Sequence, residues 1–414
     1  MNPPLQVDTA RTGQELETLA SFSDAPAPAV TRVLFTEQDV AARAYLKGLM
    51  AQAGLTIRQD AVGNLFGRWP GTDPDIPAVA TGSHTDAIPH SGRFDGTVGV
   101  LGGLEAIRAL QRAGVRLRRS IELIMFTAEE PTRFGLGCLG SRLLSGSLDP
   151  ARAATLCDSE GRSLEQVRTQ AGLDEALSTV PLPTGHYDAF VELHIEQGPI
   201  LEREGIDIGV VTAIAAPATI RISLRGAGGH AGATLMPGRR DAFLAAAEVG
   251  LAVERAALKS NSPDAVATTG ICRIHPAAVN SIPSQAQLEI DVRDTKLDVR
   301  DAIVDAIRAA TDQICARRNI EFTVEILNAD PPATCAASII SAIDETCQDA
   351  QLSSRRMVSR AYHDSLFMAR ITPTAMIFIP CRRGVSHRPD EYASPDAIQR
   401  GILALAGTLA RLAS

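Results

Sequence analysis

Histidine and carboxylate side chains recur at the ends of four apolar segments of this chain. They are His84 and Asp86 in TGSHTD, Glu129 and Glu130 after IELIMF, His194 within FVELHIEQG, and His387 after AMIFIPCRRGVSH. Asp95, in SGRFDGTVG, lies in the loop that enters the first long predicted helix. Ligands of open α/β sheets bind just beyond the carboxyl ends of the strands. Imidazole and carboxylate without thiolate form a ligand set that suits zinc, manganese or cobalt.

Each of these residues has a simpler explanation when it is considered alone. A single histidine after a strand is usually a capped or solvated loop residue, and a Glu-Glu pair is usually surface charge. Asp95 beside Gly96 is also ordinary turn chemistry. The same chemistry at four strand ends, in a chain with only eight histidines, favours a shared metal site.

The elements that must position these residues follow an α/β pattern. Residues 76–80 and 121–126 are nearly continuous apolar runs, which is typical of strands covered on both faces. Between them lie four apolar residues that fit one face of a helix, which Gly114 would terminate: Leu101, Leu104, Ile107 and Leu110. This alternation predicts an α/β domain with a mainly parallel central sheet.

The pattern changes near residue 213, which predicts an inserted domain. Alternating strands are expected at 220–224 and 287–292, with long helices at about 240–257 and 297–316. This β-α-β-β-α-β order is typical of a ferredoxin-like α+β sandwich with one open sheet face. The α/β pattern resumes around Pro331 and Pro332. We therefore predict a metal-binding catalytic domain at 1–212 and 326–414, and the inserted domain at 213–325.

Composition limits the class of protein. The 414 residues are 45% hydrophobic and 21% charged, so the chain can bury full cores and is too apolar for a disordered protein. The net charge of −8, without a basic stretch, argues against nucleic acid as a partner. There is no signal-peptide core and no apolar run approaching about 18 residues, so no membrane association is expected. Seven scattered cysteines without a C-x-x-C pair indicate reduced thiols, and we expect a soluble cytoplasmic protein.

Several longer motifs occur in order along the chain. They are GSHTDAIPHSGRFDGTVGVLGGLEAI, FTAEEPTRFGLGCLGSRLLSG, ELHIEQGPILEREGIDIGVV, GGHAGATLMPGRRDA and GVSHRPDEY. Together they resemble the hydantoinase/carbamoylase family of amidases, which includes allantoate amidohydrolases, N-carbamoyl-L-amino acid hydrolases and β-ureidopropionases. That family belongs to the clan of dinuclear-zinc aminoacylases and carboxypeptidases. The resemblance covers nearly the whole chain, and ELHIEQGP is its most specific part because other branches of the clan do not usually carry it.

The resemblance implies two divalent ions per subunit, of zinc, manganese or cobalt. Its motifs assign Asp95 as the carboxylate bridging both ions, His84 and His194 as ligands of one ion, and Glu130 and His387 as ligands of the other. Asp86 matches a carboxylate that orients the imidazole of His84. Glu129 matches the general base, and adjacent side chains diverge, so one glutamate can ligate while the other reaches the water. Gln197, directly after ELHIE, is a candidate substrate contact.

The resemblance also implies that the inserted domain is a dimerisation and lid module, which completes the site of the neighbouring subunit in a homodimer. His230 in GGHAG would donate to the reaction oxyanion, and Arg293 in DVRD would clamp a substrate carboxylate, with Asn280 assisting. For His230 the alternative is an ordinary loop histidine. For Arg293 it is an ion pair inside the domain with Asp291 or Asp294.

The chain departs from the family pattern before its last predicted strand. Members usually carry S-G-A-G-H-D-A there, whereas residues 359–365 read S-R-A-Y-H-D-S. Arg360 and Tyr362 therefore replace two glycines, while His363 and Asp364 remain. One interpretation is an altered pocket in which Arg360, Tyr362 and His363 contact the substrate. The other is a loop whose new side chains point outward.

These observations predict a metal-dependent amidohydrolase that cleaves a non-peptide C–N bond of a carbamoyl or ureido carboxylic acid. N-carbamoyl amino acids and allantoate-like compounds are the expected substrates. The alternatives are a deacylase or dipeptidase of the same clan that acts on an N-acyl amino acid, and an enzyme whose substrate has diverged with the 360–362 loop. A binding protein without metal is disfavoured, because both glutamates, Asp95 and the three ligand histidines are present.

Overall fold

The computed structural model describes residues 5–414, and the chain forms two compact units. Unit 1 comprises the residues up to Thr212, together with Thr334–Ser359 and His363–Ser414. Unit 2 comprises Ala213–Ala333 and the three residues Arg360–Tyr362. The chain therefore contributes to unit 2 twice, once with a whole folded segment and once with three residues.

Unit 1 is built on a nine-stranded mixed sheet, with the order β15-β8-β17-β7-β4-β6-β3-β2 and with β16 paired to β8. Four strands pair in parallel at its centre: β17 (Thr374–Ile379), β7 (Tyr187–Ile195), β4 (Ala78–His84) and β6 (Ile121–Phe126). The flanking strands are β15 (Ala333–Thr334), β8 (Ile208–Ile214), β16 (Ser354–Ser359), β3 (Leu65–Trp69) and β2 (Thr56–Gln59). Both β8 and β3 join the parallel strands in antiparallel fashion. The predicted α/β fold with a mainly parallel central sheet is confirmed.

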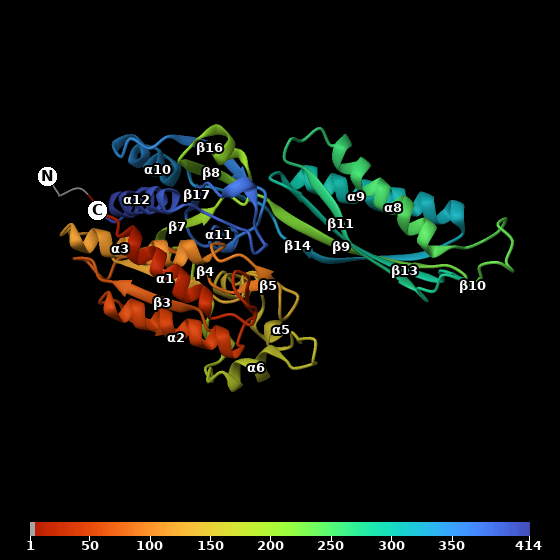
Figure 1. Ribbon diagram of the computed structural model, residues 1–414, viewed down its shortest axis with the longest axis horizontal. Helices are drawn as coiled ribbons and strands as arrows, with labels where there is room; N and C mark the ends of the chain where they lie inside the picture. The colour runs from red at the N-terminus through yellow and green to blue at the C-terminus, as the bar shows by residue number, and fades with distance from the viewer. Residues whose placement is uncertain (1–4) are drawn as a thin grey trace. The chain divides into compact units, whose positions relative to one another are not determined.

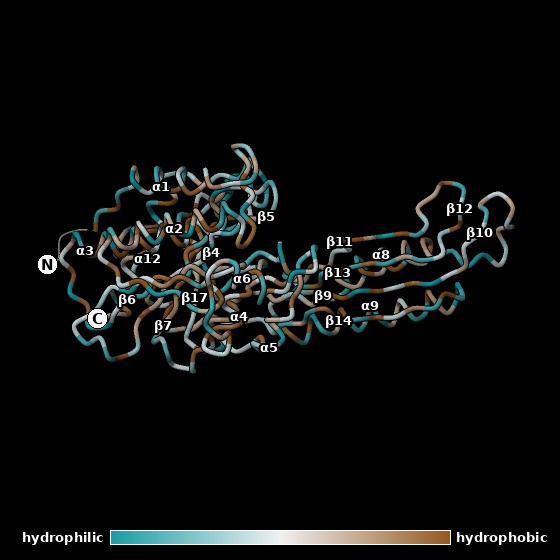
Figure 2. The backbone as a smooth tube through the Cα atoms, turned by 90° about the horizontal axis from the view of Figure 1, so that it is seen from below, coloured by the Kyte–Doolittle hydropathy of each residue, from teal (hydrophilic) through white to brown (hydrophobic). Residues whose placement is uncertain are grey.

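The central strands are buried because helices cover both faces of the sheet. Every residue of β4, β6 and β17 is buried, and the hydrophobic colour runs through β17 in Figure 2. One face packs against α3 (Thr97–Arg112), α12 (Pro395–Leu412), α10 (Ala337–Asp349) and, outside them, α1 (Thr9–Ser21) (Figure 1). The other face packs against α4 (Leu139–Leu144) and α11 (Asp364–Met368). The remaining elements are β1 (Val30–Arg32), α2 (Glu37–Gln52), β5 (Ala87–Ser91), α5 (Pro150–Ala154), α6 (Leu164–Gln170) and α7 (Ile200–Glu204).

Helix α3 matches the helix expected from the apolar spacing. Its four predicted face residues, Leu101, Leu104, Ile107 and Leu110, are fully buried. The helix ends at Arg112, and Gly114 follows with φ of 64°, a left-handed conformation that glycine adopts without strain. Since α3 begins directly after Gly96, it fixes the backbone of the loop that carries Asp95.

Unit 2 has a four-stranded antiparallel sheet with two helices on one face. Its elements in chain order are β9 (Ala216–Arg225), α8 (Ala242–Lys259), β11 (Val266–His275), β13 (Gln285–Asp294), α9 (Leu297–Arg318) and β14 (Glu321–Ala329). The order across the sheet is β11-β13-β9-β14. Figure 1 shows α8 and α9 side by side over these strands, and their apolar residues form one core with the inner face of the sheet. The predicted β-α-β-β-α-β order is therefore present. A separate ribbon joins β10 (Gly229–His230) and β12 (Ser281–Ile282).

Two further expectations concern membranes and thiols. Within residues 5–414, the helices are all too short or too polar to cross a membrane. The seven cysteines all lie in this described part of the chain and form no disulfide with one another.

Gly82→Ala should destabilise unit 1, because a Cβ at this position of β4 would overlap the backbone carbonyl of Ile124 on the paired strand β6. Overpacking a core costs about 1–3 kcal/mol, and a backbone obstacle cannot rotate away. Gly48→Ala in α2 is the matched control, since nothing lies within 4 Å of its Cβ and alanine is favoured in a helix by up to about 1 kcal/mol. Thermal unfolding followed by circular dichroism should give a lower midpoint for Gly82→Ala only. Equal midpoints would contradict the close approach of β4 and β6.

Candidate metal centre

The candidate metal ligands of unit 1 converge at the carboxyl edge of the parallel strands. His84 is the last residue of β4, His194 is the penultimate residue of β7, and Glu129 and Glu130 lie just beyond the end of β6. The parallel register pairs His84 with Phe126, the last residue of β6, so these strand ends are level. Imidazoles and carboxylates therefore occupy the edge at which open α/β sheets bind ligands.

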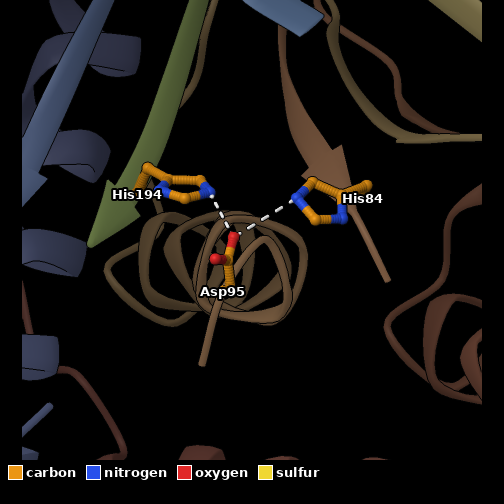
Figure 3. Close-up of side chains that lie close together, drawn as sticks. All are labelled: His84, Asp95 and His194. Carbon is orange, nitrogen blue, oxygen red and sulfur yellow. Dashed lines mark ion pairs between the residues drawn. The ribbon is translucent and has the colours of Figure 1, made fainter. Parts of the chain in front are cut away.

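Asp95 lies between two sets of candidate ligands. Its Oδ1 is 3.5 Å from Nε2 of His84 and 3.2 Å from Nε2 of His194 (Figure 3). Its Oδ2 is 3.4 Å from Nε2 of His387, which in turn is 3.2 Å from Oε1 of Glu130. Each carboxylate oxygen thus faces a different set. These separations of 3.2–3.5 Å are those expected of atoms that share a cation at about 2.0–2.2 Å from each of them.

The electrostatics of this cluster favour a bound cation. Burial alone would lower the pKa of His84, but the surrounding carboxylates, Glu129 foremost, raise it well above its usual value. Hydrogen bonds to Asp95 and Glu130 raise the pKa of His387 to about 11. Burial alone would raise the pKa of Asp95, yet its contacts with the histidines hold that pKa well below the usual range. Because an imidazole must be neutral to bind a metal ion, binding releases these protons and metal affinity rises with pH.

Asp86 supports the residues on either side of the cluster. Its Oδ1 accepts the backbone N–H of Glu129 at 3.2 Å, and its Oδ2 accepts that of Glu130 at 3.0 Å. Its backbone carbonyl is 3.1 Å from Nδ1 of His84, whereas its Oδ1 is 3.6 Å from the same nitrogen. In this geometry the carbonyl orients the imidazole, and the carboxylate holds the backbone of both glutamates.

The two glutamates point to different partners. Glu130 contacts His387, whereas Oε2 of Glu129 is 3.8 Å from Nε2 of His84 and belongs to neither ligand set of Asp95. The thiol of Cys138 donates to Oε1 of Glu129 at 3.8 Å. Burial raises the pKa of Glu129 well above its usual value. Glu129 is therefore a buried carboxyl group beside the candidate ligands, placed to exchange a proton.

The backbone of the site is held in the left-handed region at three non-glycine residues: Ala128 (φ 51°), Gln197 (φ 54°) and His387 (φ 57°). Such conformations cost of order 1 kcal/mol or more and persist only where the surroundings impose them. Gly96 (φ 66°) has a further reason to lack a side chain, because a Cβ there would collide with the imidazole of His84. The Asp95-Gly96 pair is thus a turn that also permits the close approach of Asp95 to that imidazole.

Ser386 and Glu391 complete the surroundings of Asp95, and the sequence analysis did not identify them. The hydroxyl of Ser386 lies 2.5 Å from Oδ2 of Asp95 and 2.9 Å from Oε2 of Glu391. Oε1 of Glu391 accepts the backbone N–H groups of Phe94 and Asp95. Burial, and then the charge of Asp95, raises the pKa of Glu391 to about 7. The sequence signal that could have indicated these two residues is their position on either side of His387 in GVSHRPDEY. It is weak, because RPDE resembles an ordinary solvated turn.

Gln197 contacts the same carboxylate. Its Nε2 donates to Oδ2 of Asp95 at 2.6 Å and lies 3.2 Å from Oγ of Ser386. Its Oε1 is buried and has no hydrogen-bond partner among residues 5–414. A buried acceptor without a donor costs about 1–3 kcal/mol. Oε1 of Gln197 is therefore suited to accept a hydrogen bond from a ligand.

A second layer of polar residues lies behind His194. Glu192, two residues earlier on β7, is fully buried and accepts hydrogen bonds from Ser83 and Ser365 at 2.7 and 2.6 Å. The ring of His363 lies 4.5 Å from that of His194, and it is only 2% exposed. His363 was predicted to contact substrate, and the structure places it against a candidate ligand, His194. Glu192 was missed, although a charged residue inside an apolar strand is itself a signal.

His230, Asn280 and Arg293 were expected to act together. In unit 2 the structure brings His230 and Asn280 together but not Arg293. His230 in β10 pairs with Ser281 in β12, and the carbonyl of Asn280 accepts the N–H of Ala231. This ribbon adjoins the Gln285 end of β13, whereas Arg293 lies eight residues further along that strand. At about 3.3 Å per residue, the separation is roughly 26 Å. His230 and Asn280 of one chain therefore cannot contact the same small ligand as Arg293 of that chain.

Arg293 lies in a cluster with Arg360 and Tyr362, the two residues that differ from the expected glycines. Its Nε and Nη2 donate to Asp291 at 2.7 and 3.2 Å, which is the ion pair considered as an alternative. Its guanidinium carbon is 5.6 Å from the centre of the Tyr362 ring. The guanidinium of Arg360 donates to Asp264 at 2.6 Å. The side chain of Arg360, expected to contact substrate, is therefore occupied by an aspartate of unit 2.

Comparisons with known proteins agree over nearly the full length. The chain matches peptidase family M20/M25/M40 over residues 80–411. It is 54% identical to the ureidoglycolate hydrolase of Arabidopsis thaliana, over 99% of this chain and 87% of that protein. It is 37% identical to the N-carbamoyl-L-amino acid amidohydrolase of Geobacillus stearothermophilus, over 97% of this chain and 98% of that protein.

Solved structures give the same result. Those of AtUAH in complex with glyoxylate and with (S)-hydroxyglycine are 53% identical, with a TM-score of 0.92 over 99% of this chain and 98% of that chain. A hydantoinase/carbamoylase family amidase from Burkholderia vietnamiensis is 33% identical, with a TM-score of 0.91 over 100% of this chain and 99% of that chain. The similarity therefore includes both the units that this chain forms.

Asp95→Ala should weaken metal binding in both ligand sets, because each set contains one oxygen of this carboxylate. Glu129→Gln should retain metal, because Glu129 lies outside both sets. Asp188→Ala, which removes an exposed aspartate of β7, is the control for substitution elsewhere in unit 1. Calorimetric titration of the metal-free proteins with manganese or zinc should show a loss of at least about tenfold in affinity for Asp95→Ala alone. Unchanged binding by Asp95→Ala would exclude a shared carboxylate.

Proposed function

Because this chain belongs to peptidase family M20/M25/M40, within its hydantoinase/carbamoylase group, we propose that it hydrolyses a small ureido carboxylic acid of the ureidoglycolate type. Enzymes named in this group act on carbon–nitrogen bonds other than peptide bonds, and this chain is a hydrolase of that class. The identity of 54% with a ureidoglycolate hydrolase, against 37% with an N-carbamoyl-L-amino acid amidohydrolase, favours ureidoglycolate. This difference over nearly the whole chain is the observation that carries the choice of substrate.

We propose that two divalent ions of zinc, manganese or cobalt bind at the carboxyl edge of unit 1. His84 and His194 would hold one, Glu130 and His387 the other, and Asp95 would bridge them. The support is that the two oxygens of Asp95 face separate sets of imidazoles. Such ions polarise a substrate carbonyl and lower the pKa of a water molecule.

Glu129 would move the proton in this reaction. The attacking water gives a proton to Glu129 while its oxygen bonds to the ureido carbonyl carbon. Glu129 then delivers that proton to the leaving nitrogen as the C–N bond breaks. The support is geometric, since Glu129 is buried beside His84 yet is outside both ligand sets of Asp95.

For ureidoglycolate this hydrolysis yields carbamate and hydroxyglycine. Carbamate decomposes to ammonia and carbon dioxide, and hydroxyglycine, a carbinolamine, loses ammonia to give glyoxylate. Both organic products have counterparts in the AtUAH complexes, which contain (S)-hydroxyglycine and glyoxylate. The overall products would be glyoxylate, carbon dioxide and two molecules of ammonia.

The substrate itself would be held by groups of complementary chemistry. Arg293 would clamp its carboxylate, since a planar guanidinium can bind a carboxylate through two parallel hydrogen bonds. Oε1 of Gln197, which is buried without a partner in residues 5–414, would accept a hydrogen bond from a ureido N–H. Tyr362 and His363, which were also predicted to contact substrate, lie against Arg293 and His194.

His230 and Asn280 would reach this site from a second copy of the chain, because in one chain they lie at the far end of β13 from Arg293. Two surfaces of unit 2 suit a homodimer. Helix α8 exposes leucines at heptad spacing, at Leu244, Leu251 and Leu258, and β11, beneath it, is an edge strand of the sheet. Exposed apolar side chains of this kind commonly mark protein interfaces.

A hydrolysis screen tests the substrate. (S)-Ureidoglycolate, allantoate, N-carbamoyl-L-alanine and N-acetyl-L-alanine are compared with manganese, cobalt and zinc, and release of ammonia, amine and glyoxylate is measured. We expect kcat/KM to be at least about tenfold higher for ureidoglycolate, which corresponds to about one lost hydrogen bond or charge contact in the others. Glu129→Gln is the control for enzymatic turnover. Fastest cleavage of the N-acetyl compound would instead assign a deacylase.

Mixing two inactive variants tests the composite site. His230→Ala and Glu129→Gln proteins should regain activity when subunits exchange, because half of the mixed population carries one site without either lesion. Random exchange predicts about one quarter of the wild-type activity. A mixture of Asp95→Ala and Glu129→Gln is the matched control and should stay inactive, since both lesions lie in unit 1. No rescue, with exchange demonstrated by mass-tagged subunits, would exclude a contribution of His230 in trans.

A further inference from the structure

The three residues Arg360–Tyr362 belong to unit 2, although the chain on both sides of them belongs to unit 1. Ser359 ends β16, and His363 lies against His194. The chain therefore joins this segment to unit 1 at both ends, and one of the joining residues, His363, touches a candidate metal ligand. Arg360 and Tyr362 of this segment contact residues of unit 2.

Arg360 attaches this segment to unit 2 at two points. Nη2 of its side chain donates to Oδ1 of Asp264 at 2.6 Å. Its backbone carbonyl accepts a hydrogen bond from Nη1 of Arg293 at 3.3 Å. Asp264 lies two residues before Val266, the residue of β11 that pairs with Arg293 in β13. The ion pair and the backbone contact thus lie at the same end of the sheet.

Arg293 is consequently held from three sides. Asp291, two residues earlier and on the same face of β13, accepts from Nε and Nη2. The carbonyl of Arg360 accepts from Nη1, and the ring of Tyr362 lies 5.6 Å from the guanidinium carbon, within the range of a cation–π contact. A long arginine side chain loses about 2 kcal/mol of rotamer freedom when it is ordered. These contacts order it before a ligand arrives.

We propose that Arg360 and Asp264 form a latch that positions Arg293 for the substrate carboxylate. Both are positioning residues that act through Arg293, and the proposal rests on the proposed role of Arg293 as the carboxylate clamp. The latch fixes segment 360–362, which places the Arg360 carbonyl and the Tyr362 ring against the guanidinium. Glycine at 360 would remove the ion pair and give the segment more backbone freedom.

The size of the effect follows from the exposure of the pair. The Arg360 side chain is 43% exposed and that of Asp264 is 20% exposed, and ion pairs of this kind change an equilibrium by about two- to fivefold. The latch orders a group that binds the carboxylate, and neither of its residues belongs to a ligand set of Asp95. Its loss should therefore raise KM for carboxylate substrates by this factor, with kcat and metal content nearly unchanged.

A double-mutant cycle with a charge swap tests the latch. Arg360→Ala and Asp264→Ala should each raise KM for ureidoglycolate about two- to fivefold, and the double variant should be no worse than either single variant. The swap of Arg360→Asp with Asp264→Arg should recover part of the loss. Arg355→Ala is the matched control, because it removes a similarly exposed arginine paired with Glu204 in unit 1. The amide of the ureido acid lacks the carboxylate, so its KM should be the same for all of these variants.

Two comparisons separate the latch from the clamp on which it rests. Arg293→Ala should raise KM for the carboxylate substrate at least about tenfold, as expected for loss of a charged hydrogen-bonded pair. If Arg293→Ala has no such effect, the clamp itself is wrong. If Arg293→Ala has the effect but Arg360→Ala and Asp264→Ala act additively or not at all, the clamp stands and the latch is overturned. Tyr362→Phe keeps the ring and should have the KM of the wild type, whereas Tyr362→Gly should raise KM as Arg360→Ala does. If both variants raise KM equally, the Tyr362 hydroxyl is a direct substrate contact instead.

Discussion

The carboxylate of Asp95 must present one oxygen to each of two sets of imidazoles, and much of unit 1 serves to make this possible. Parallel strands bring His84 and His194 to the same edge, because their carboxyl ends are level. Gly96 lets the loop before α3 approach His84 without a side chain in the way. Gln197 then contacts Oδ2 from the other side. The position of the Asp95 carboxylate thus depends on the register of the parallel strands, on the left-handed conformation of Gly96, and on the loop that carries Gln197.

This arrangement concentrates buried acids, and burial and neighbouring charges shift the pKa values of these groups. Burial raises the pKa of Glu129, and burial together with Asp95 raises that of Glu391, while His387 is held protonated by its carboxylate partners. Binding of cations at these positions would displace protons from the imidazoles, because an imidazole must be neutral to bind a metal ion. Since such a site is destabilising without its cations, the surrounding core must be stable enough to tolerate it. The strands β4 and β6, which end at the cluster, are buried along their whole length.

The sequence could predict those features that depend on local pattern. Apolar runs and helix spacing record burial directly, so the α/β sheet and the inserted β-α-β-β-α-β unit follow from them. Candidate ligands follow from residue type at strand ends. Glu391 was not predictable in this way, because its partners Phe94 and Asp95 are nearly three hundred residues away in the chain. The distance between Asn280 and Arg293 was in principle predictable, because an intervening strand of known rise separates them.

The 360–362 segment shows why a departure from a motif is easier to detect than to interpret. Replacing two glycines signals a change of function or of packing, but the direction of a new side chain depends on its tertiary neighbours. Here Asp264 supplies an opposite charge for Arg360, and Arg293 supplies a cation for the ring of Tyr362. A substrate as small as the proposed ureidoglycolate would offer few contacts, so the entropy of ordering each protein group would be a large fraction of its binding free energy. Ordering Arg293 in advance would reduce that cost, and under the proposed latch this gives Arg360 and Tyr362 a physical role without either side chain contacting the substrate.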